Sequence, residues 1–154
     1  MNIQTILANL KIEQLNAMQQ AAIDAYREGG DLILLSPTGS GKTLAYLLPL
    51  VTLLKSGVEG VQAVILVPSR ELALQIEQVF KSMNTGFTIM SCYGGRPAME
   101  EHRTMKGIRP SVIVGTPGRM NDHLEKQNFD ASVVSLLVID EFDKCLEFGF
   151  QEEM

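Results

Sequence analysis

The chain has 154 residues, of which 45% are hydrophobic and 20% are charged, and its formal net charge at pH 7 is -5. This composition is typical of one globular domain with a hydrophobic core and excludes an intrinsically disordered chain. The apolar runs are too short to span a membrane and the first residues lack the basic start of a signal peptide, so we expect a soluble, cytoplasmic protein with no membrane partner.

The negative charge is concentrated near the end of the chain. From Asn121 onward nine acidic residues stand against two lysines, so the preceding part has a small positive net charge. The overall acidity therefore does not exclude a nucleic-acid partner, although helices with scattered surface charges explain the pattern equally well. The basic residues in the middle of the chain, which stand near only Glu100 and Glu101, are Arg96, Arg103, Lys106, Arg109 and Arg119.

Short apolar runs alternate with segments of helical spacing. The runs predict strands that are covered on both faces of a parallel sheet, over 31–35, 62–67, 87–92, 111–114 and 133–139. Helices are predicted over 13–26, 42–54, 70–83, 98–106 and 118–126. Ser69 and Thr116 are expected to be N-caps, and Pro49 is expected to kink or end the second helix. The alternation predicts an open α/β fold with its ligand site at the carboxyl ends of the strands.

A glycine-rich segment follows the first predicted strand and predicts a phosphate-binding loop. Glycines let backbone N–H groups turn toward phosphates, the Lys42 ammonium reaches the outer phosphate oxygens, and the Thr43 hydroxyl is placed for Mg²⁺. The alternative is a plain glycine-rich turn, which the position between a buried strand and a helix disfavours. The segment consists of Ser36, Pro37, Thr38, Gly39, Ser40, Gly41, Lys42 and Thr43.

Two adjacent acids, Asp140 and Glu141, follow the last predicted strand. Phosphate-loop enzymes need one carboxylate near Mg²⁺ and a second that orients a water molecule, so we expect Asp140 on the metal side and Glu141 as the base. The alternative is an acidic strand end that opens a helix. The phosphate loop upstream favours the catalytic interpretation.

The cysteines and histidines show no pattern of a metal site. Cys92 and Cys145 lack the spacing of a disulfide scaffold or a zinc site, so we expect buried thiols that contribute to no metal site. His102 and His123 match no motif and are expected on helix surfaces.

Several segments resemble, in order, the motifs of the DEAD-box family of ATP-dependent RNA helicases. The signature D-E-A-D is matched by Asp140 to Asp143, with Phe142 in place of the alanine. The remaining matches are 15–19 with the Q motif, although both of its prolines are absent, 39–43 with motif I, 68–73 with motif Ia, Gly94 and Gly95 with the GG doublet, and 116–119 with motif Ib. From Leu15 onward, the chain resembles the N-terminal RecA-like domain of such a helicase.

The resemblance implies a RecA-like open, mostly parallel sheet with helices on both faces, forming one ATP-binding domain over 1–154. The resemblance implies ATP and Mg²⁺ as cofactors. It also implies RNA as a partner, single-stranded or duplex, which the protein contacts through the RNA backbone. The implied ATP-binding residues are Gln19 on adenine, Ser36, Thr38, Gly39, Ser40, Gly41, Lys42 and Thr43. The implied catalytic residues are Lys42, Asp140 and Glu141, with Thr43 and Asp140 toward the metal. The implied RNA-binding residues are Pro68, Arg70, Gly94, Gly95, Thr116, Pro117, Gly118 and Arg119.

The sequence printed here stops before the S-A-T motif and the second RecA-like domain that the resemblance implies. We therefore expect a sheet without the central strand between the phosphate-loop strand and the signature strand. We also expect nucleotide binding without unwinding and with negligible ATPase activity. Two alternatives stay open, which are another phosphate-loop NTPase or kinase, and an RNA- or protein-binding module that does not use nucleotide.

Overall fold

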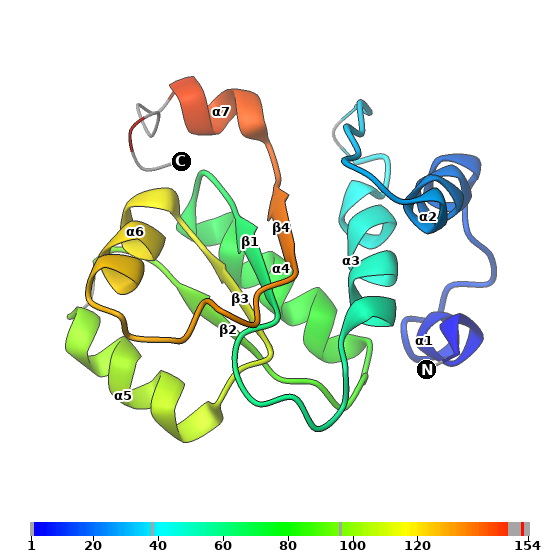
Figure 1. Cartoon of the computed structure of the whole chain (residues 1–154). Coiled ribbons are helices and arrows are strands. Elements are labelled where there is room, and N and C mark those ends of the chain that lie inside the picture. The colour runs from blue at the N-terminus through cyan, green and yellow to red at the C-terminus, as the bar shows by residue number, and fades with distance from the viewer. Residues whose placement is uncertain (1, 38, 96, 148–151, 153–154) are drawn as a thin grey trace.

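The computed structural model describes every residue except 1, 38, 96, 148–151, 153 and 154 (Figure 1). The described residues form one four-stranded sheet in the order β2-β3-β1-β4, and every pair of neighbouring strands is parallel. The strands are β1 (Ala63–Leu66), β2 (Ile89–Cys92), β3 (Val112–Gly115) and β4 (Leu136–Ile139). Ala63 of β1 pairs with Val112 of β3 and Leu136 of β4, so the strand starts are aligned.

Helices cover both faces of the sheet. They are α1 (Ile3–Asn9), α2 (Ala17–Glu28), α3 (Lys42–Leu53), α4 (Arg70–Ser82), α5 (Ala98–Ile108), α6 (Pro117–Glu125) and α7 (Phe142–Glu147). Successive side chains of a strand point to opposite faces. Ile65 accordingly packs with the α3 and α4 side chains, and its neighbour Leu66 packs with Met105 of α5 and Met120 of α6. The strands β1, β2 and β3 are buried throughout, as their continuous hydrophobicity predicted.

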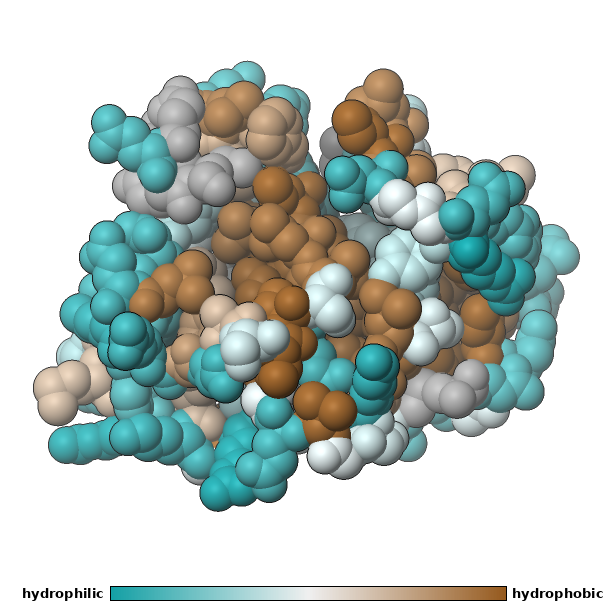
Figure 2. Space-filling view, in the orientation of Figure 1, coloured by the Kyte–Doolittle hydropathy of each residue, from teal (hydrophilic) through white to brown (hydrophobic). Residues whose placement is uncertain are grey.

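The strand predicted over 31–35 is wrong. These residues form no helix or strand, and Ile33 and Leu35 are 85% and 89% exposed. A strand needs a neighbour to pair with its backbone N–H and C=O groups. Among the described strands none pairs with this segment, and β4 pairs with β1 alone. Figure 2 shows hydrophobic residues gathered on this side of the molecule, over β4 and over the loop that precedes α3.

Three further local expectations concern the helices. Pro49 does not end α3, which continues to Leu53 because the burial of residues such as Leu50 outweighs the hydrogen bond that a proline removes. Thr116 is the N-cap residue of α6, as predicted, but its side chain makes no capping hydrogen bond. Ser69 caps α4 as predicted, because its hydroxyl accepts a hydrogen bond from the Leu72 N–H.

Among the described helices, none has the length and the hydrophobicity needed to cross a lipid bilayer.

Candidate active site

The strands of the sheet end on the side of the molecule where α3 and α7 begin (Figure 1). Asp140 directly follows β4, Arg70 begins the helix that follows β1, and Thr116 directly follows β3. Parallel strands in one sheet bring these ends to the same edge. Residues 39–41 lead into α3. The helix lies next to the end of β4, since its residue Tyr46 donates a hydrogen bond to Asp140.

The predicted phosphate loop is closed by its own hydrogen bonds. The Lys42 ammonium donates to the carbonyl oxygens of Ser36 and Pro37, at 2.5 and 3.2 Å. The Ser36 hydroxyl donates to the Ser40 hydroxyl at 2.5 Å, and Ser40 in turn donates to the Pro37 carbonyl. These acceptors of Lys42 are neutral, so an anionic phosphate oxygen would be a stronger acceptor. Thr38, predicted to bind ATP, lies outside the described residues.

Gln19 lies against this loop. Its side-chain amide N–H donates to the Gly41 carbonyl at 3.2 Å, and its side-chain oxygen accepts from the Asn16 N–H at 3.0 Å. The Asn16 amide donates to the Ser40 carbonyl at 3.0 Å and thus makes a second bond to the loop. A Cβ atom on Gly41 would lie 2.6 Å from the Gln19 amide nitrogen, so any larger residue there would push the Gln19 amide from its position. Asn16 was not predicted to touch the loop.

The two acids after β4 are held by different partners. The Asp140 N–H donates to the Leu66 carbonyl at 2.9 Å and extends the pairing of β4 with β1. One Asp140 carboxylate oxygen accepts from the Glu141 N–H at 2.9 Å, and the other accepts from the Tyr46 hydroxyl at 3.0 Å. Glu141 has a φ of +50°, in the left-handed region, and its carboxylate pairs with Lys144 at 2.9 Å.

Tyr46 joins the two groups predicted to face the metal. Besides bonding to Asp140, the Tyr46 hydroxyl lies close enough to the Thr43 side chain for Thr43 to influence the pKa of Tyr46. Burial and the nearby Asp140 charge raise the pKa of Tyr46, so the phenol stays neutral and can donate. A hydroxyl and a carboxylate are oxygen ligands of the kind that Mg²⁺ prefers. Thr43 and Asp140 therefore fit a magnesium ion by their chemistry and by their common neighbour.

The segments predicted to bind RNA meet around Glu101. The exposed Arg70 places its guanidinium 4.8 Å from the centre of the Tyr93 ring. The Tyr93 N–H donates to one oxygen of Glu101 at 3.1 Å. Arg119 donates to the other oxygen at 3.0 Å, and its side chain is only 13% exposed. Tyr93, which precedes the Gly94–Gly95 doublet, and Arg119 of segment 116–119 thus bond to the same buried carboxylate. The sequence analysis did not single out Glu101.

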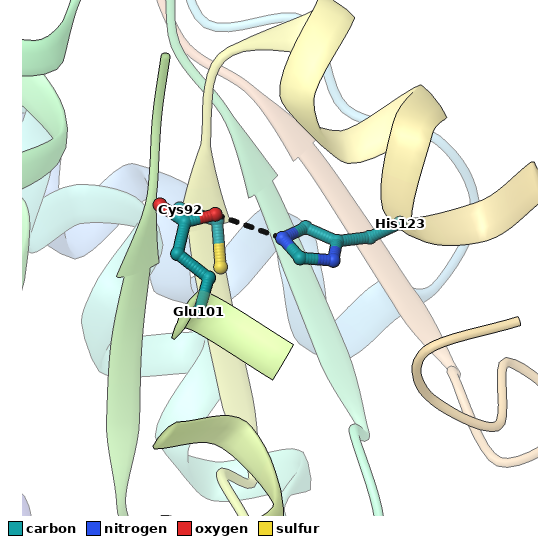
Figure 3. A group of neighbouring side chains, drawn as sticks. All are labelled: Cys92, Glu101 and His123. Atoms are coloured by element: carbon teal, nitrogen blue, oxygen red, sulfur yellow. Dashed lines mark hydrogen bonds and ion pairs between the residues drawn. The ribbon is translucent and has the colours of Figure 1, made fainter. Parts of the chain in front are cut away.

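His123 contradicts the expectation of a surface position. It is fully buried, and its Nε2 lies 2.8 Å from Glu101 (Figure 3). The Asn128 amide nitrogen lies 2.8 Å from Nδ1 and can only donate, so Nε2 carries the hydrogen that Glu101 accepts. Both ring nitrogens have partners, which is what permits the burial. His102, half-buried on α5, bonds to the side-chain oxygen of Asn128.

Cys92, for which the sequence predicted no metal site, lies beside this pair. The ligand atoms of Cys92, Glu101 and His123 lie within 4.8 Å of one another (Figure 3). The positive charge next to Glu101 is already supplied by Arg119, which opposes a metal cation at this position. The predicted burial of Cys92 and Cys145 is confirmed. Burial also raises the pKa of the Cys145 thiol.

The sequence matches the DEAD/DEAH box helicase family over residues 16–154. The chain belongs to this family. It is 37% identical over 153 residues to the ATP-dependent RNA helicase DeaD of Mycobacterium tuberculosis, covering 96% of this chain and 27% of the relative. It is 39% identical over 155 residues to the ATP-dependent RNA helicase DBP10 of Saccharomyces cerevisiae, covering 97% of this chain and 16% of the relative. The chain thus spans about a quarter or less of the length of these relatives.

Solved structures of the family confirm the predicted RecA-like fold. A DEAD box protein from Methanococcus jannaschii superimposes with a TM-score of 0.90 at 30% identity, over 99% of this chain and 42% of that one. The RNA helicase Prp28 from Chaetomium thermophilum, bound to ADP, gives 0.87 at 34% identity, over 98% of this chain and 38% of that one.

Some contributors to the helicase-family site were missed by sequence reasoning. Asn16 had a recognisable signal, because Asn16 and Gln19 form the capping box of α2, a pattern readable from the spacing of the two residues. Tyr46 and Glu101 had none, because their partners Asp140 and Arg119 lie 94 and 18 residues away. Only the folded chain brings them together.

Proposed function

We propose that this chain is the ATP-binding and RNA-contacting domain of a DEAD-box RNA helicase that couples ATP hydrolysis to unwinding of RNA duplexes. One observation carries the proposal. The phosphate loop before α3 and the acids after β4 lie at one edge of the sheet, joined by the bond between Tyr46 and Asp140. The names of the relatives as ATP-dependent RNA helicases, and the ADP bound to Prp28, support the same activity for the whole protein.

The phosphate loop supplies the contacts to the nucleotide. Lys42 exchanges its carbonyl partners for the charged oxygens of the phosphates, and backbone N–H groups at Gly39, Ser40 and Gly41 turn toward them. The Gln19 side-chain amide offers one donor and one acceptor, which match the N7 acceptor and the N6 donor of adenine. Because the Gln19 amide also bonds to Gly41, recognition of the base is linked to the shape of the loop.

Asp140 and Thr43 hold Mg²⁺ in this proposal, and Glu141 orients the attacking water. When bound, Mg²⁺ supplies charge neutralisation on the phosphate oxygens. The left-handed backbone of Glu141 and its ion pair with Lys144 fix the position of the side chain that this role requires. As a general base it accepts the proton of the water.

The RNA backbone runs over the loops after β1, β2 and β3. Arg70 is exposed and supplies positive charge, while backbone groups of Gly94, Gly95 and residues 116–118 approach the phosphates. Arg119 stabilises the segment 116–119 through its ion pair with Glu101, because its side chain is mostly buried there. Contacts of this kind do not read the base sequence.

The described groups lack an arginine finger from a second RecA-like domain, which is worth about 10³- to 10⁵-fold in rate in related phosphoryl-transfer enzymes. We therefore propose that this chain alone binds nucleotide but neither unwinds RNA nor hydrolyses ATP at a helicase rate. The full protein needs the second domain as an intramolecular partner.

The test is a thermal melt of the chain with Mg-ADP, with Mg-GDP and without nucleotide. A ligand at about 100 times its Kd stabilises the folded state by about 2.7 kcal/mol. We expect ADP, but not GDP, to raise the melting temperature, and Lys42→Ala to remove the shift. Lys55→Ala, at an exposed lysine just after α3, is the matched control that should keep it.

Two results would contradict the proposal. Equal shifts with ADP and GDP would favour another phosphate-loop NTPase or kinase. RNA binding that is unaffected by Lys42→Ala, together with no shift by either nucleotide, would favour an RNA- or protein-binding module that does not use nucleotide.

A further inference from the structure

Tyr46 occupies a distinctive place on α3. It lies three residues after Thr43, so the two side chains share one face of the helix. Its ring packs against the hydrophobic core, while its hydroxyl reaches the end of β4. The ring thus fixes where the hydroxyl stands, and helix geometry places that hydroxyl beside Thr43.

The Tyr46 hydroxyl contacts the Asp140 carboxylate, which has one other hydrogen-bond donor among the described contacts. One oxygen of Asp140 accepts from the adjacent Glu141 N–H, and the other accepts from Tyr46 at 3.0 Å. With both oxygens engaged, rotation of the carboxylate is restricted. A carboxylate has about four acceptor positions, so about two remain for a metal ion or its water molecules.

We propose that Tyr46 is a positioning residue whose hydroxyl holds the Asp140 carboxylate beside Thr43 and so sets the affinity for the magnesium complex of the nucleotide. This inference rests on the proposed function. A partner that orients a metal ligand typically affects metal affinity by about 10- to 100-fold when removed. Tyr46 also lies on the helix that begins at Lys42, so it ties the phosphate loop to the signature acids through one rigid element.

The experiment measures ADP binding calorimetrically, with Mg²⁺ and with EDTA, for the wild-type chain and for Tyr46→Phe, which removes only the hydroxyl. We expect the affinity in EDTA to be unchanged and the gain in affinity caused by Mg²⁺ to fall about ten-fold. Tyr26→Phe makes the same chemical change on α2 and should leave both values unchanged. A melt without nucleotide shows whether each variant is folded.

A double-mutant cycle separates positioning from a structural effect. Asp140→Ala removes the carboxylate on which Tyr46 acts, so adding Tyr46→Phe should cause no further loss of Mg²⁺ dependence. A merely structural role of the hydroxyl would instead lower the melting temperature and the EDTA affinity in both backgrounds. That result would overturn the inference. The comparison of the two backgrounds can be made even if Tyr46→Phe lowers the stability of the chain.

The outcomes also distinguish this inference from the function on which it rests. Wild-type binding that Mg²⁺ strengthens, with an equal gain in Tyr46→Phe, overturns the role of Tyr46 and leaves the proposed function standing. No ADP binding by the wild-type chain overturns both. A selective loss of the Mg²⁺ gain in Tyr46→Phe supports both.

Discussion

Arg119 and Glu101 form a buried ion pair at 3.0 Å, and their side chains are 13% and 0% exposed. The pair joins α5 to the start of α6, and through Tyr93 it reaches the end of β2. Arg119 was predicted from sequence to bind RNA. Its charge is compensated inside the protein by Glu101, whereas Arg70 is exposed.

We predict that the two arginines differ in the salt dependence of RNA binding. Loss of one phosphate contact to single-stranded RNA should reduce the slope of log K against log salt by about 0.7. Arg70→Gln should show this reduction, and Arg119→Gln should keep the wild-type slope, in fluorescence anisotropy titrations over a range of salt concentrations. Equal reductions in both variants would mean that Arg119 also contacts phosphate.

Glu101→Ala should be strongly destabilising. It removes the carboxylate that Arg119 and His123 share, and removing one partner of a buried pair costs about 3–5 kcal/mol. Urea unfolding followed by circular dichroism measures the change. The control is Glu100→Ala at the adjacent exposed glutamate, which should change stability by about 0.5 kcal/mol or less. A similar small change in both variants would remove Glu101 from the centre of this network.

Gly41→Ala should cost more than the left-handed backbone alone explains. Gly41 and Gly57 have φ values of +89° and +82°, but an added Cβ meets the Gln19 amide only at Gly41. Both variants bear the backbone cost of about 1–2 kcal/mol. Gly41→Ala should lose about 1 kcal/mol more, because the Gln19 bond to the Gly41 carbonyl breaks. Equal losses in chemical denaturation would show that Gln19 moves aside without cost.

Glu141→Gln should separate nucleotide binding from hydrolysis. In a full-length protein containing this chain, the variant keeps the shape of the side chain but cannot accept a proton, so hydrolysis should fall about 10²- to 10⁴-fold with ADP affinity unchanged. Phosphate release and ADP titration are the two measurements. Glu147→Gln, at the exposed end of α7, is the matched control. Hydrolysis that persists in Glu141→Gln would disprove the assignment of the base.

The outer edge of β4 should promote self-association of this chain. Leu137 on β4 is 55% exposed, and unpaired strand edges with exposed apolar residues favour pairing between molecules. Light scattering should show mass that rises with concentration, and Leu137→Lys should reduce it. Leu124→Lys, at a leucine on α6 that is 46% exposed, should not. A monomer at all concentrations would refute the prediction.

Local patterns in the sequence were sufficient for most of the fold. The continuous apolar runs of β1, β2 and β3 predicted buried parallel strands, because a strand covered on both faces has no polar side. The phosphate loop could be predicted because its glycines, lysine and threonine lie within eight adjacent residues, and its binding of nucleotide stays a prediction. The match to the helicase family followed from such short motifs in order.

Tertiary structure decided the features that depend on distant partners. Residues 31–35 have the apolar pattern of a strand, but pairing requires a neighbour that the described sheet does not supply. His123 has no motif, and its burial depends on Glu101 reaching it from another helix. Tyr46 looks like an ordinary core residue until folding places Asp140 3.0 Å from its hydroxyl. Hydrogen bonds and ion pairs are short-range, so a sequence reveals them only where the partners are also neighbours along the chain.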